Sequence, residues 1–208
     1  MPIPLIVKNI KGLSAFKQNV KPTLFARLAD FVMQRKAKKV YEKIGEFLHS
    51  GDKILDIGVG AGGNSCFLLK KGFQVKGVDV ADLSIYQDLK AQLYDGKCLP
   101  FQDKEFEVAL LIHVLHHCEN PEKILKEAKR VAKRVIFIED TYRNPLEKLV
   151  VSVSDMLGNF EFWLHPYKTS GQWQEFCKAN DWQVIKSFSW SEFLVAGIYG
   201  RYCLFVIE

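Results

Sequence analysis

A glycine-rich stretch at residues 54–63, Ile-Leu-Asp-Ile-Gly-Val-Gly-Ala-Gly-Gly, has the residue types of a ligand-binding turn. Gly58 and Gly60 allow the backbone to approach a ligand without an intervening Cβ. A helix that begins near Gly62 would direct N–H groups and the positive end of its dipole at the same ligand. The spacing of Gly58, Gly60 and Gly63 also satisfies the dinucleotide-binding pattern G-x-G-x-x-G, which is a weak signal when it stands alone.

Two acidic residues add the chemistry that a nucleoside would need. Asp79 closes a strand-like run at residues 73–78, where a carboxylate can accept hydrogen bonds from ribose hydroxyls. Asp95 lies in Tyr-Asp-Gly, shortly before Leu-Pro-Phe at residues 99–101. The end of a third strand would place Asp95 beside the base of the nucleoside.

Several side chains in the second half of the chain could accept a proton from a substrate. A positioned base such as His contributes roughly 10²- to 10⁴-fold in rate when its pKa lies near the working pH. The candidates for such a catalytic role are His116, His117, His165, Glu139 and Asp140.

A metal site is an alternative role for the histidine-rich loop. Its ligand-competent side chains are His113, His116, His117 and Cys118. All four crowd into one loop, and no second Cys or His pair at finger spacing completes a tetrahedral site. The sequence therefore predicts no metal.

These residues are positioned by an alternation of apolar strands and amphipathic helices. Strands are predicted at residues 52–58, 73–79, 106–112 and 135–139, with helices at 64–71, after Asn120-Pro121, and at 171–180. Between Asp79 and Asp95 the chain is too short for a full crossover helix, so we expect one or two turns and a short strand near residues 91–94. Because ligands of open α/β sheets bind at the carboxyl ends of strands, the acidic residues and the histidines should face one site.

Four sequence blocks in this order resemble the class I S-adenosylmethionine (SAM) methyltransferases, and among them the small type 11 enzymes. The blocks are the glycine-rich stretch, Gly-Val-Asp at 77–79, Tyr-Asp-Gly at 94–96 with Leu-Pro-Phe at 99–101, and Val-Leu-His-His at 114–117. The resemblance covers roughly residues 53–139 and is poor in the flanks.

The resemblance implies a SAM-dependent methyltransferase that acts on a small-molecule or lipid-like acceptor. Asp56 would support the methionine end of SAM, Asp79 would hold its ribose, and Asp95 would meet its adenine amino group. The full predicted set of cofactor-binding residues is Asp56, Gly58, Val59, Gly60, Gly62, Asp79, Val80, Asp95, Gly96 and His113. A NAD(P)-linked oxidoreductase and a non-catalytic module with the same fold are the alternatives.

The implied fold is a single Rossmann-like, three-layer α/β domain with a mostly parallel seven-stranded sheet, an antiparallel last strand and an N-terminal helical extension. A chain of 208 residues, 48% hydrophobic and 25% charged, fits one such domain. Residues 1–49 would form the extension and residues 50–208 the SAM-binding domain. The closing strands are expected at 182–190 and 201–207. Residues 143–170 carry many aromatic side chains and no clear strand, which indicates a lid-like insertion.

The N-terminal extension is strongly basic. Residues 1–43 contain ten Lys or Arg against Asp30 and Glu42, and two apolar stripes at helical spacing predict two amphipathic helices. Packing on the domain with a solvated basic face is the simpler interpretation, and contact with membrane headgroups or an anionic acceptor is the alternative. Nucleic acid is less favoured because the basic stretch lacks an RNA-binding motif and interleaved aromatic residues.

Other features of the sequence bear on the cellular compartment. No apolar run reaches the roughly 18 residues of a membrane span, and the first residues lack the pattern of a signal peptide. Five cysteines in no framework spacing favour reduced thiols. We therefore expect a cytoplasmic protein. The basic helices would also allow it to attach peripherally to a membrane.

Overall fold

The computed structural model describes residues 24–86, 89–159, 165–195 and 198–208, and seven strands in these residues form one sheet. The strands are β1 (Lys53–Ile57), β2 (Gln74–Asp79), β3 (Gln92–Leu93), β4 (Phe106–Ile112), β5 (Ala132–Asp140), β6 (Val184–Val195) and β7 (Ile198–Ile207). Their order is β3-β2-β1-β4-β5-β7-β6. The pairs β1–β2 and β2–β3 are parallel, whereas β7 runs antiparallel to both β5 and β6. The predicted fold class is confirmed.

The chain divides into two compact units. The first contains residues 1–100 and 106–108, and the second contains residues 101–105 and 109–208. The first three residues of β4 therefore belong to one unit and its remaining four residues to the other.

In the first unit, β1, α4 (Gly63–Lys70) and β2 form the strand-turn-helix-strand segment that the glycine pattern predicts. All of β1 except Lys53 is buried. Helix α4 begins after Gly62, with a φ of 86°, and is followed by Gly72, with a φ of 91°. Both angles lie in the left-handed region that favours glycine, so these two residues set the ends of the helix.

Strand β3 has only two residues, as the short connection predicts. Leu93 of β3 lies opposite Asp79 of β2. Within the described residues between these strands, 80–86 and 89–91, no helix is assigned.

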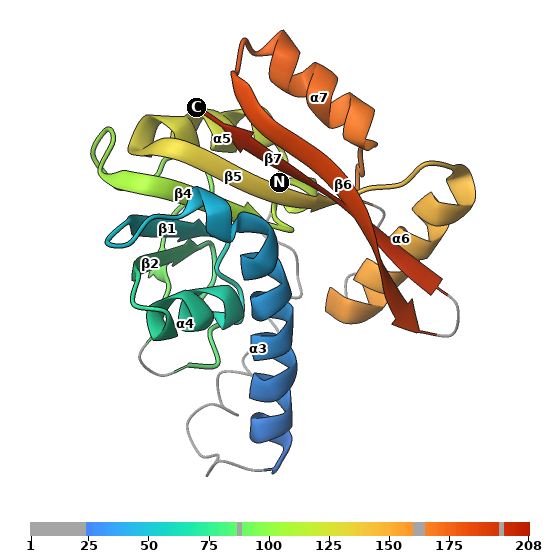
Figure 1. The fold of residues 1–208 in the computed structure, drawn as a ribbon, viewed down its shortest axis with the longest axis horizontal. Helices are drawn as coiled ribbons and strands as arrows, with labels where there is room; N and C mark the ends of the chain where they lie inside the picture. The colour runs from blue at the N-terminus through green and yellow to red at the C-terminus, as the bar shows by residue number, and fades with distance from the viewer. Residues whose placement is uncertain (1–23, 87–88, 160–164, 196–197) are drawn as a thin grey trace. The chain divides into compact units, whose positions relative to one another are not determined.

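Where two amphipathic helices are predicted, the structure has one helix, α3 (Leu24–Ile44), which contains the first apolar stripe and the beginning of the second, up to Ile44. Residues 33–39, between the stripes, are Met-Gln-Arg-Lys-Ala-Lys-Lys, and all are good helix formers. A single helix therefore continues through them and ends at a short 3₁₀ turn, η1 (Gly45–Phe47). Helix α3 packs against α4 (Figure 1), and Met33 Cβ lies 3.2 Å from the position that a Cβ on Gly63 would occupy. Residues 1–23 lie outside the described part of the chain.

In the second unit, β4 leads into a short turn, η2 (Leu115–His117), and then into α5 (Pro121–Val131). Asn120 caps this helix by accepting a hydrogen bond from the Lys123 N–H at 2.9 Å. The apolar face of α5 is buried, at Ile124, Leu125, Ala128 and Val131. The helix runs directly into β5, with no residue between the two elements.

Helix α6 (Pro145–Asn159) occupies much of the segment that the sequence analysis expected to be an irregular insertion. Asn144 accepts a hydrogen bond from the Glu147 N–H at 2.9 Å, and Pro145 follows as the first helical residue. This Asn-Pro start is the same signal that predicted α5, and it could have revealed α6. Three aromatic residues of the expected lid, Phe160, Phe162 and Trp163, lie outside the described residues.

The unit closes with α7 (Ser170–Ala179) and the antiparallel pair β6–β7. Thr169 and Gln172 form a capping box at the start of α7, which is the helix predicted at residues 171–180. Strand β5 pairs with residues 202–207 of β7, whereas β6 pairs with residues 198–207. The pair therefore extends beyond β5 as a two-stranded ribbon, drawn in red in Figure 1.

Candidate functional site

The turn after β1 is fixed by backbone hydrogen bonds to β2. The N–H groups of Gly58 and Val59 both donate to the Val78 carbonyl, at 2.9 and 3.2 Å. Gly58 and Gly60 have φ angles of 73° and 51°, which favour glycine. Among the described residues, a Cβ on Gly60 would have one neighbour within 4 Å, the Gly58 carbonyl oxygen at 3.9 Å. A ligand could therefore approach the backbone closely at Gly60.

Asp79, at the carboxyl end of β2, is tied to this turn. Its Oδ2 accepts the Gly60 N–H at 2.8 Å, and its Oδ1 accepts the N–H groups of Val80 and Ala81 at 2.7 and 3.4 Å. Burial raises the pKa of Asp79 above its usual value, and the three hydrogen bonds oppose that rise. An ionised carboxylate offers about four acceptor positions, so Asp79 retains capacity for a hydroxyl donor.

Asp56 lies buried on β1, and its Oδ2 accepts a hydrogen bond from the Ser65 hydroxyl of α4 at 2.7 Å. Burial raises the pKa of Asp56 to about 6; the Ser65 hydrogen bond opposes this rise, and the charge of Asp79 adds to it. Asp56 thus links β1 to the first turn of the helix that follows the glycines.

Asp95 is exposed and closes a turn just after β3. Its Oδ1 accepts the N–H groups of Lys97 and Cys98 at 2.8 and 2.9 Å. These hydrogen bonds lower the pKa of Asp95, and the bond from Cys98 has the larger effect. The carboxylate is therefore ionised over the physiological pH range.

The carboxyl ends of β2 and β3 lie side by side. The Tyr94 N–H donates to the Asp79 carbonyl at 3.1 Å. A Cβ on Gly96 would lie 3.2 Å from Cγ1 of Val80, so the turn that contains Asp95 packs on Val80. The first unit thus brings the predicted residues of β2 and β3 to one edge of the sheet.

Gly62 makes close contacts within the protein. A Cβ on Gly62 would lie 3.0 Å from Ser84 Oγ and 3.1 Å from Tyr86 Cδ2. Neither Ser84 nor Tyr86 is among the residues predicted for the site. The sequence gives no signal for them, because their neighbours are distant in the chain.

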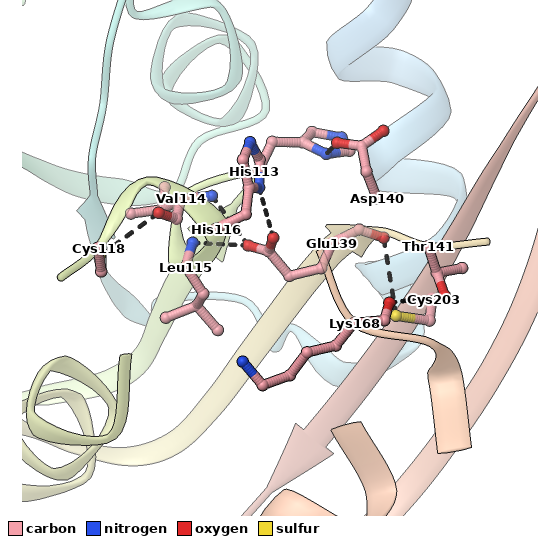
Figure 2. A network of polar contacts seen from close by, with 10 residues as sticks. All are labelled: His113, Val114, Leu115, His116, Cys118, Glu139, Asp140, Thr141, Lys168 and Cys203. Carbon is pink, nitrogen blue, oxygen red and sulfur yellow. Dashed lines mark hydrogen bonds and ion pairs between the residues drawn. The ribbon is translucent and has the colours of Figure 1, made fainter. Parts of the chain in front are cut away.

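In the second unit, Glu139 organises the loop after β4. Its Oε1 accepts the N–H groups of Val114 and Leu115 at 2.9 and 2.7 Å, and its Oε2 lies 2.6 Å from Nδ1 of His116. Figure 2 shows the carboxylate directed from the end of β5 into this loop. Glu139 is fully buried and His116 is 3% exposed. Because a carboxylate only accepts, the short contact places the His116 proton on Nδ1.

Three further rings surround His116. Their centroids lie 4.0 Å (His117), 5.6 Å (His165) and 5.1 Å (Tyr167) from that of His116, and His117 and His165 lie 4.4 Å apart. His117 is exposed, His165 is partly exposed and Tyr167 is buried. The structure therefore brings all three candidate catalytic histidines together.

The extended segment that carries His165 and Tyr167 is anchored by Thr141, the residue that follows β5. The Thr141 hydroxyl donates to the Lys168 carbonyl at 3.0 Å (Figure 2), and the Tyr167 N–H donates to the His165 carbonyl at 2.9 Å. These bonds fix the segment that leads into α7.

His113 and Asp140 form a second pair at the ends of β4 and β5. His113 Nδ1 lies 2.8 Å from Asp140 Oδ2, and the His113 ring also packs edge-on against Tyr202, with centroids 5.5 Å apart. Burial lowers the pKa of His113, but the charge and hydrogen bond of Asp140 outweigh it, so the pKa of His113 is raised. His113 has a φ of 57°, and a positive φ in a residue other than glycine is frequent at functional sites.

Neither a metal-binding cluster nor a membrane-spanning helix is found among the residues that the structure describes. In the part of the chain that the structure describes, no group of three or more His, Cys, Asp or Glu side chains is arranged to hold a metal ion. His113 and His116 direct their Nδ1 atoms at different carboxylates instead. Among the described helices, none combines the length and the apolar character of a bilayer span.

Comparison with known proteins identifies similar sequences over part of the chain. The type 11 family model, described as a methyltransferase domain, matches residues 55–135. An uncharacterised protein of Methanocaldococcus jannaschii is 41% identical over 85 residues, which are 38% of this chain and 39% of that protein. A demethylmenaquinone methyltransferase of Tropheryma whipplei is 29% identical over 93 residues, which are 40% of this chain and 38% of that protein. The chain thus spans about two fifths of the length of these two relatives.

A third relative matches a longer stretch. A ubiquinone biosynthesis O-methyltransferase of Idiomarina loihiensis is 29% identical over 146 residues, 63% of this chain and 58% of that protein.

Solved structures share the fold. A SAM-dependent methyltransferase of Methanosarcina mazei superposes with a TM-score of 0.63 at 19% identity and covers 80% of this chain and 96% of its own. The cyclase SpnF has the same TM-score at 15% identity and covers 84% of this chain and 80% of its own. At such identities the likeness establishes the fold, which proteins with different chemistry share.

Proposed function

Since the chain belongs to the class I SAM-dependent methyltransferases of type 11, we propose that it transfers a methyl group from SAM to a small-molecule or lipid-like acceptor. The observation that carries this proposal is the bond between Asp79 and the Gly60 N–H. It holds the glycine turn open beside a carboxylate that can accept a ribose hydroxyl.

The residues of the first unit fit the chemistry of SAM. Asp79 would accept a ribose hydroxyl, and Asp95 would accept a hydrogen from the adenine amino group. The backbone at Gly58 and Gly60 would lie against the bond between methionine and ribose, where a Cβ would intrude. The buried carboxylate of Asp56 would favour the positively charged methionine end. Bound SAM supplies an electrophilic methyl group on a sulfonium.

The remaining cofactor residues would make apolar and backbone contacts. Val80 is exposed and packs beside Gly96, so its side chain would cover one face of the adenine. Val59, buried against Gly77, would contribute backbone only. His113, the remaining predicted residue, belongs to the second unit, where Asp140 fixes the orientation of its ring.

The second unit offers the groups that would take a proton from a hydroxyl or amine acceptor. Burial supports His117 and His165, rather than His116, as the side chains that meet the acceptor. Glu139 and His116 would then act beneath them, because Glu139 fixes the loop and orients His116. The reaction also depends on alignment of the acceptor atom with the methyl group, which can contribute about 7 to 11 kcal/mol.

The acceptor class is supported by the relatives. Their names include a demethylmenaquinone methyltransferase, a sterol 4-C-methyltransferase and a sarcosine/dimethylglycine N-methyltransferase. Two of these three names denote lipophilic acceptors, and the third denotes a small amine.

We propose that the outer face of α3 makes a peripheral contact with anionic membranes. Such a contact would fit a lipid-like acceptor. The exposed side chains on this face are Phe31, Val32, Arg35, Lys36, Lys38 and Lys39. Phe31 and Val32 are 57% and 45% exposed, and the Arg35 guanidinium lies 5.5 Å above the Phe31 ring. Exposed apolar residues among Lys and Arg are typical of helices that lie in the membrane interface.

Binding and transfer can be tested separately. Calorimetric titrations of the protein with S-adenosylhomocysteine and with NAD should show binding of the first and none of the second. The reverse result would support the oxidoreductase. Incubation with methyl-labelled SAM and fractionated cell extract should then place label in the lipid or small-molecule fraction. Binding of S-adenosylhomocysteine without transfer of label to any fraction would instead support a non-catalytic module.

A further inference from the structure

Residues 84–86 lie between the glycine turn and helix α3, and they contact both. On the inner side, the Ile85 N–H donates to the Ala61 carbonyl at 3.1 Å. The Tyr86 ring and the Ser84 hydroxyl occupy the space beside Gly62, 3.1 and 3.0 Å from where its Cβ would be. On the outer side, the Tyr86 hydroxyl donates to Asp30 Oδ1 at 2.7 Å and accepts from Gln34 Nε2 at 3.1 Å.

This short segment has a fixed conformation of its own. The Tyr86 N–H donates to Ser84 Oγ at 3.2 Å, and the Ser84 hydroxyl lies 3.1 Å from the Tyr86 carbonyl oxygen, to which it donates. The position of the Tyr86 ring is therefore set from both ends, by the turn at Ser84 and by the two α3 side chains that bind its hydroxyl. The ring can transmit a displacement of α3 to Gly62.

We propose that Tyr86 is a positioning residue for the SAM-binding turn, and that it makes cofactor affinity depend on the docking of α3 through Asp30 and Gln34. This inference rests on the proposed function, because it concerns the same cofactor. It assigns a role in the site to three residues that the glycine pattern and the acidic residues do not indicate.

The physical reason is the conformational freedom of the turn. Gly58, Gly60 and Gly62 all have positive φ, and glycine loses more backbone entropy on ordering than any other residue. A turn with three such residues remains in one conformation only if its surroundings hold it. Asp79 holds it at Gly60, and Tyr86 holds it at Gly62. If Tyr86 no longer holds the turn, part of the free energy of cofactor binding is used to order the turn. The affinity for the cofactor is then lower.

The hydroxyl of Tyr86 is suited to a permanent hydrogen bond with Asp30. Burial and the hydrogen bond to Asp30 raise the pKa of Tyr86, so the hydroxyl keeps its proton and remains a donor. A bond between a hydroxyl and a carboxylate is stronger than one between two neutral groups. By reciprocity, cofactor binding should also strengthen the docking of α3.

The test compares variants of the full chain by calorimetric titration with S-adenosylhomocysteine. Tyr86→Phe removes the hydroxyl and keeps the ring, and Asp30→Ala removes the acceptor. We expect each to raise the dissociation constant about 5- to 20-fold, which is less than the full effect of one charge-assisted hydrogen bond because the bond acts on the cofactor only through the turn. The double variant should be no weaker than either single variant, because both remove the same link.

Two further variants separate positioning from general destabilisation. Asp30→Asn keeps an oxygen that accepts the Tyr86 hydroxyl and loses only the charge, so affinity should fall less than in Asp30→Ala. Glu42→Gln removes another acidic residue of α3, which pairs with Lys38 at 4.0 Å, and should leave affinity unchanged. Amide hydrogen exchange at residues 58–64 of the ligand-free protein should be faster in Asp30→Ala than in Asp30→Asn. This comparison carries the test if Tyr86→Phe does not fold.

The outcomes distinguish the two proposals. A wild type that binds S-adenosylhomocysteine, together with Tyr86→Phe and Asp30→Ala variants that bind it equally well, would overturn the positioning role alone. Additive losses in the double variant would also overturn it, since they would mean that the two residues act independently. A wild type that does not bind the ligand would overturn the proposed function, and this inference with it.

Discussion

His116 Nδ1 lies 2.6 Å from Glu139 Oε2, and both side chains are buried. The same carboxylate accepts two backbone N–H groups of the loop that carries the histidine. One side chain at the end of β5 therefore fixes both the path of the loop after β4 and the tautomer of its buried histidine.

Glu139→Gln should invert the tautomer of His116. The glutamine oxygen can continue to accept the backbone N–H groups of Val114 and Leu115, but its NH₂ group faces Nδ1 and donates to it. The His116 proton would then move to Nε2, which ring ¹⁵N chemical shifts report directly. Asp140→Asn, which contacts His113 instead, is the control and should leave the His116 shifts unchanged. A proton that stays on Nδ1 in Glu139→Gln would contradict this account of the pair.

Asp140→Asn should lower the pKa of His113, because the charge and the hydrogen bond of Asp140, together with the charge of Glu139, outweigh the lowering effect of burial on that ring. A histidine with a raised pKa in the folded state stabilises the protein below its unfolded pKa of about 6.5, and the contribution is lost as the pH rises through the folded value. The loss of unfolding free energy caused by Asp140→Asn should therefore be larger at pH 5 than at pH 9. Urea titrations at both pH values measure it, and a loss that is equal at both would count against the pair.

Asp56→Asn should stabilise the protein above pH 6. A carboxyl with a pKa of 3.8 when unfolded and about 6 when folded holds its proton more tightly in the folded state, so the wild type loses stability as the pH rises between these values. This shift in pKa lowers the free energy of unfolding by roughly 3 kcal/mol at most. Asparagine carries no charge, so it avoids this loss, and its side-chain oxygen still accepts the hydrogen bond from Ser65. Thermal unfolding at pH 4 and pH 8 should show the gain at pH 8 only.

The same Asp56→Asn variant should bind S-adenosylhomocysteine more weakly, since it removes the charge proposed to face the methionine end. A gain in stability together with a loss of affinity is the expected pattern for a functional buried charge. Unchanged affinity would assign Asp56 to structure alone.

Asp79→Ala should reduce affinity for S-adenosylhomocysteine. Hydrogen bonds to a charged group contribute about 1.5 to 3 kcal/mol, so we expect a loss of roughly 10- to 150-fold in a calorimetric titration. The substitution also removes the acceptor of the Gly60 N–H, so part of the loss reflects the freed turn. Asp79→Asn, which keeps one acceptor oxygen, should lose less. An Asp79→Ala variant with wild-type affinity would exclude the ribose contact.

The double substitution Phe31→Ser with Val32→Ser should abolish binding to anionic vesicles. Among the α3 side chains whose burial is described, residues 29–44, these two are the large exposed apolar ones, and burial of each in lipid would contribute about 1.5 to 3 kcal/mol. Cosedimentation with vesicles of phosphatidylglycerol and phosphatidylcholine measures the binding, with pure phosphatidylcholine vesicles as the charge control. Ile185→Ser, at an exposed apolar residue of the second unit, is the matched variant and should bind normally. Equal sedimentation of the double variant and the wild type would rule out this surface.

The local elements of the fold could be predicted from the sequence because their signals are local. The apolar run of β4 and the Asn120-Pro121 start of α5 require only neighbouring residues, and both appear at the predicted positions. Helix α6 was missed although Asn144-Pro145 carries the same signal. Its run of Val150, Val151 and Val153 weakens helix propensity, and only packing in the folded chain overrides that preference.

The sequence determined which residues are candidates for the chemistry, because glycine, carboxylate and imidazole groups can be recognised by type and spacing. The tertiary structure decided which of these candidates contact one another. Glu139 and His116 are 23 residues apart and Tyr86 and Asp30 are 56 apart, and no periodic pattern relates such pairs. His116 is buried and its neighbour His117 is exposed. This difference is also set by the whole fold, because the burial of a side chain depends on which other segments cover it.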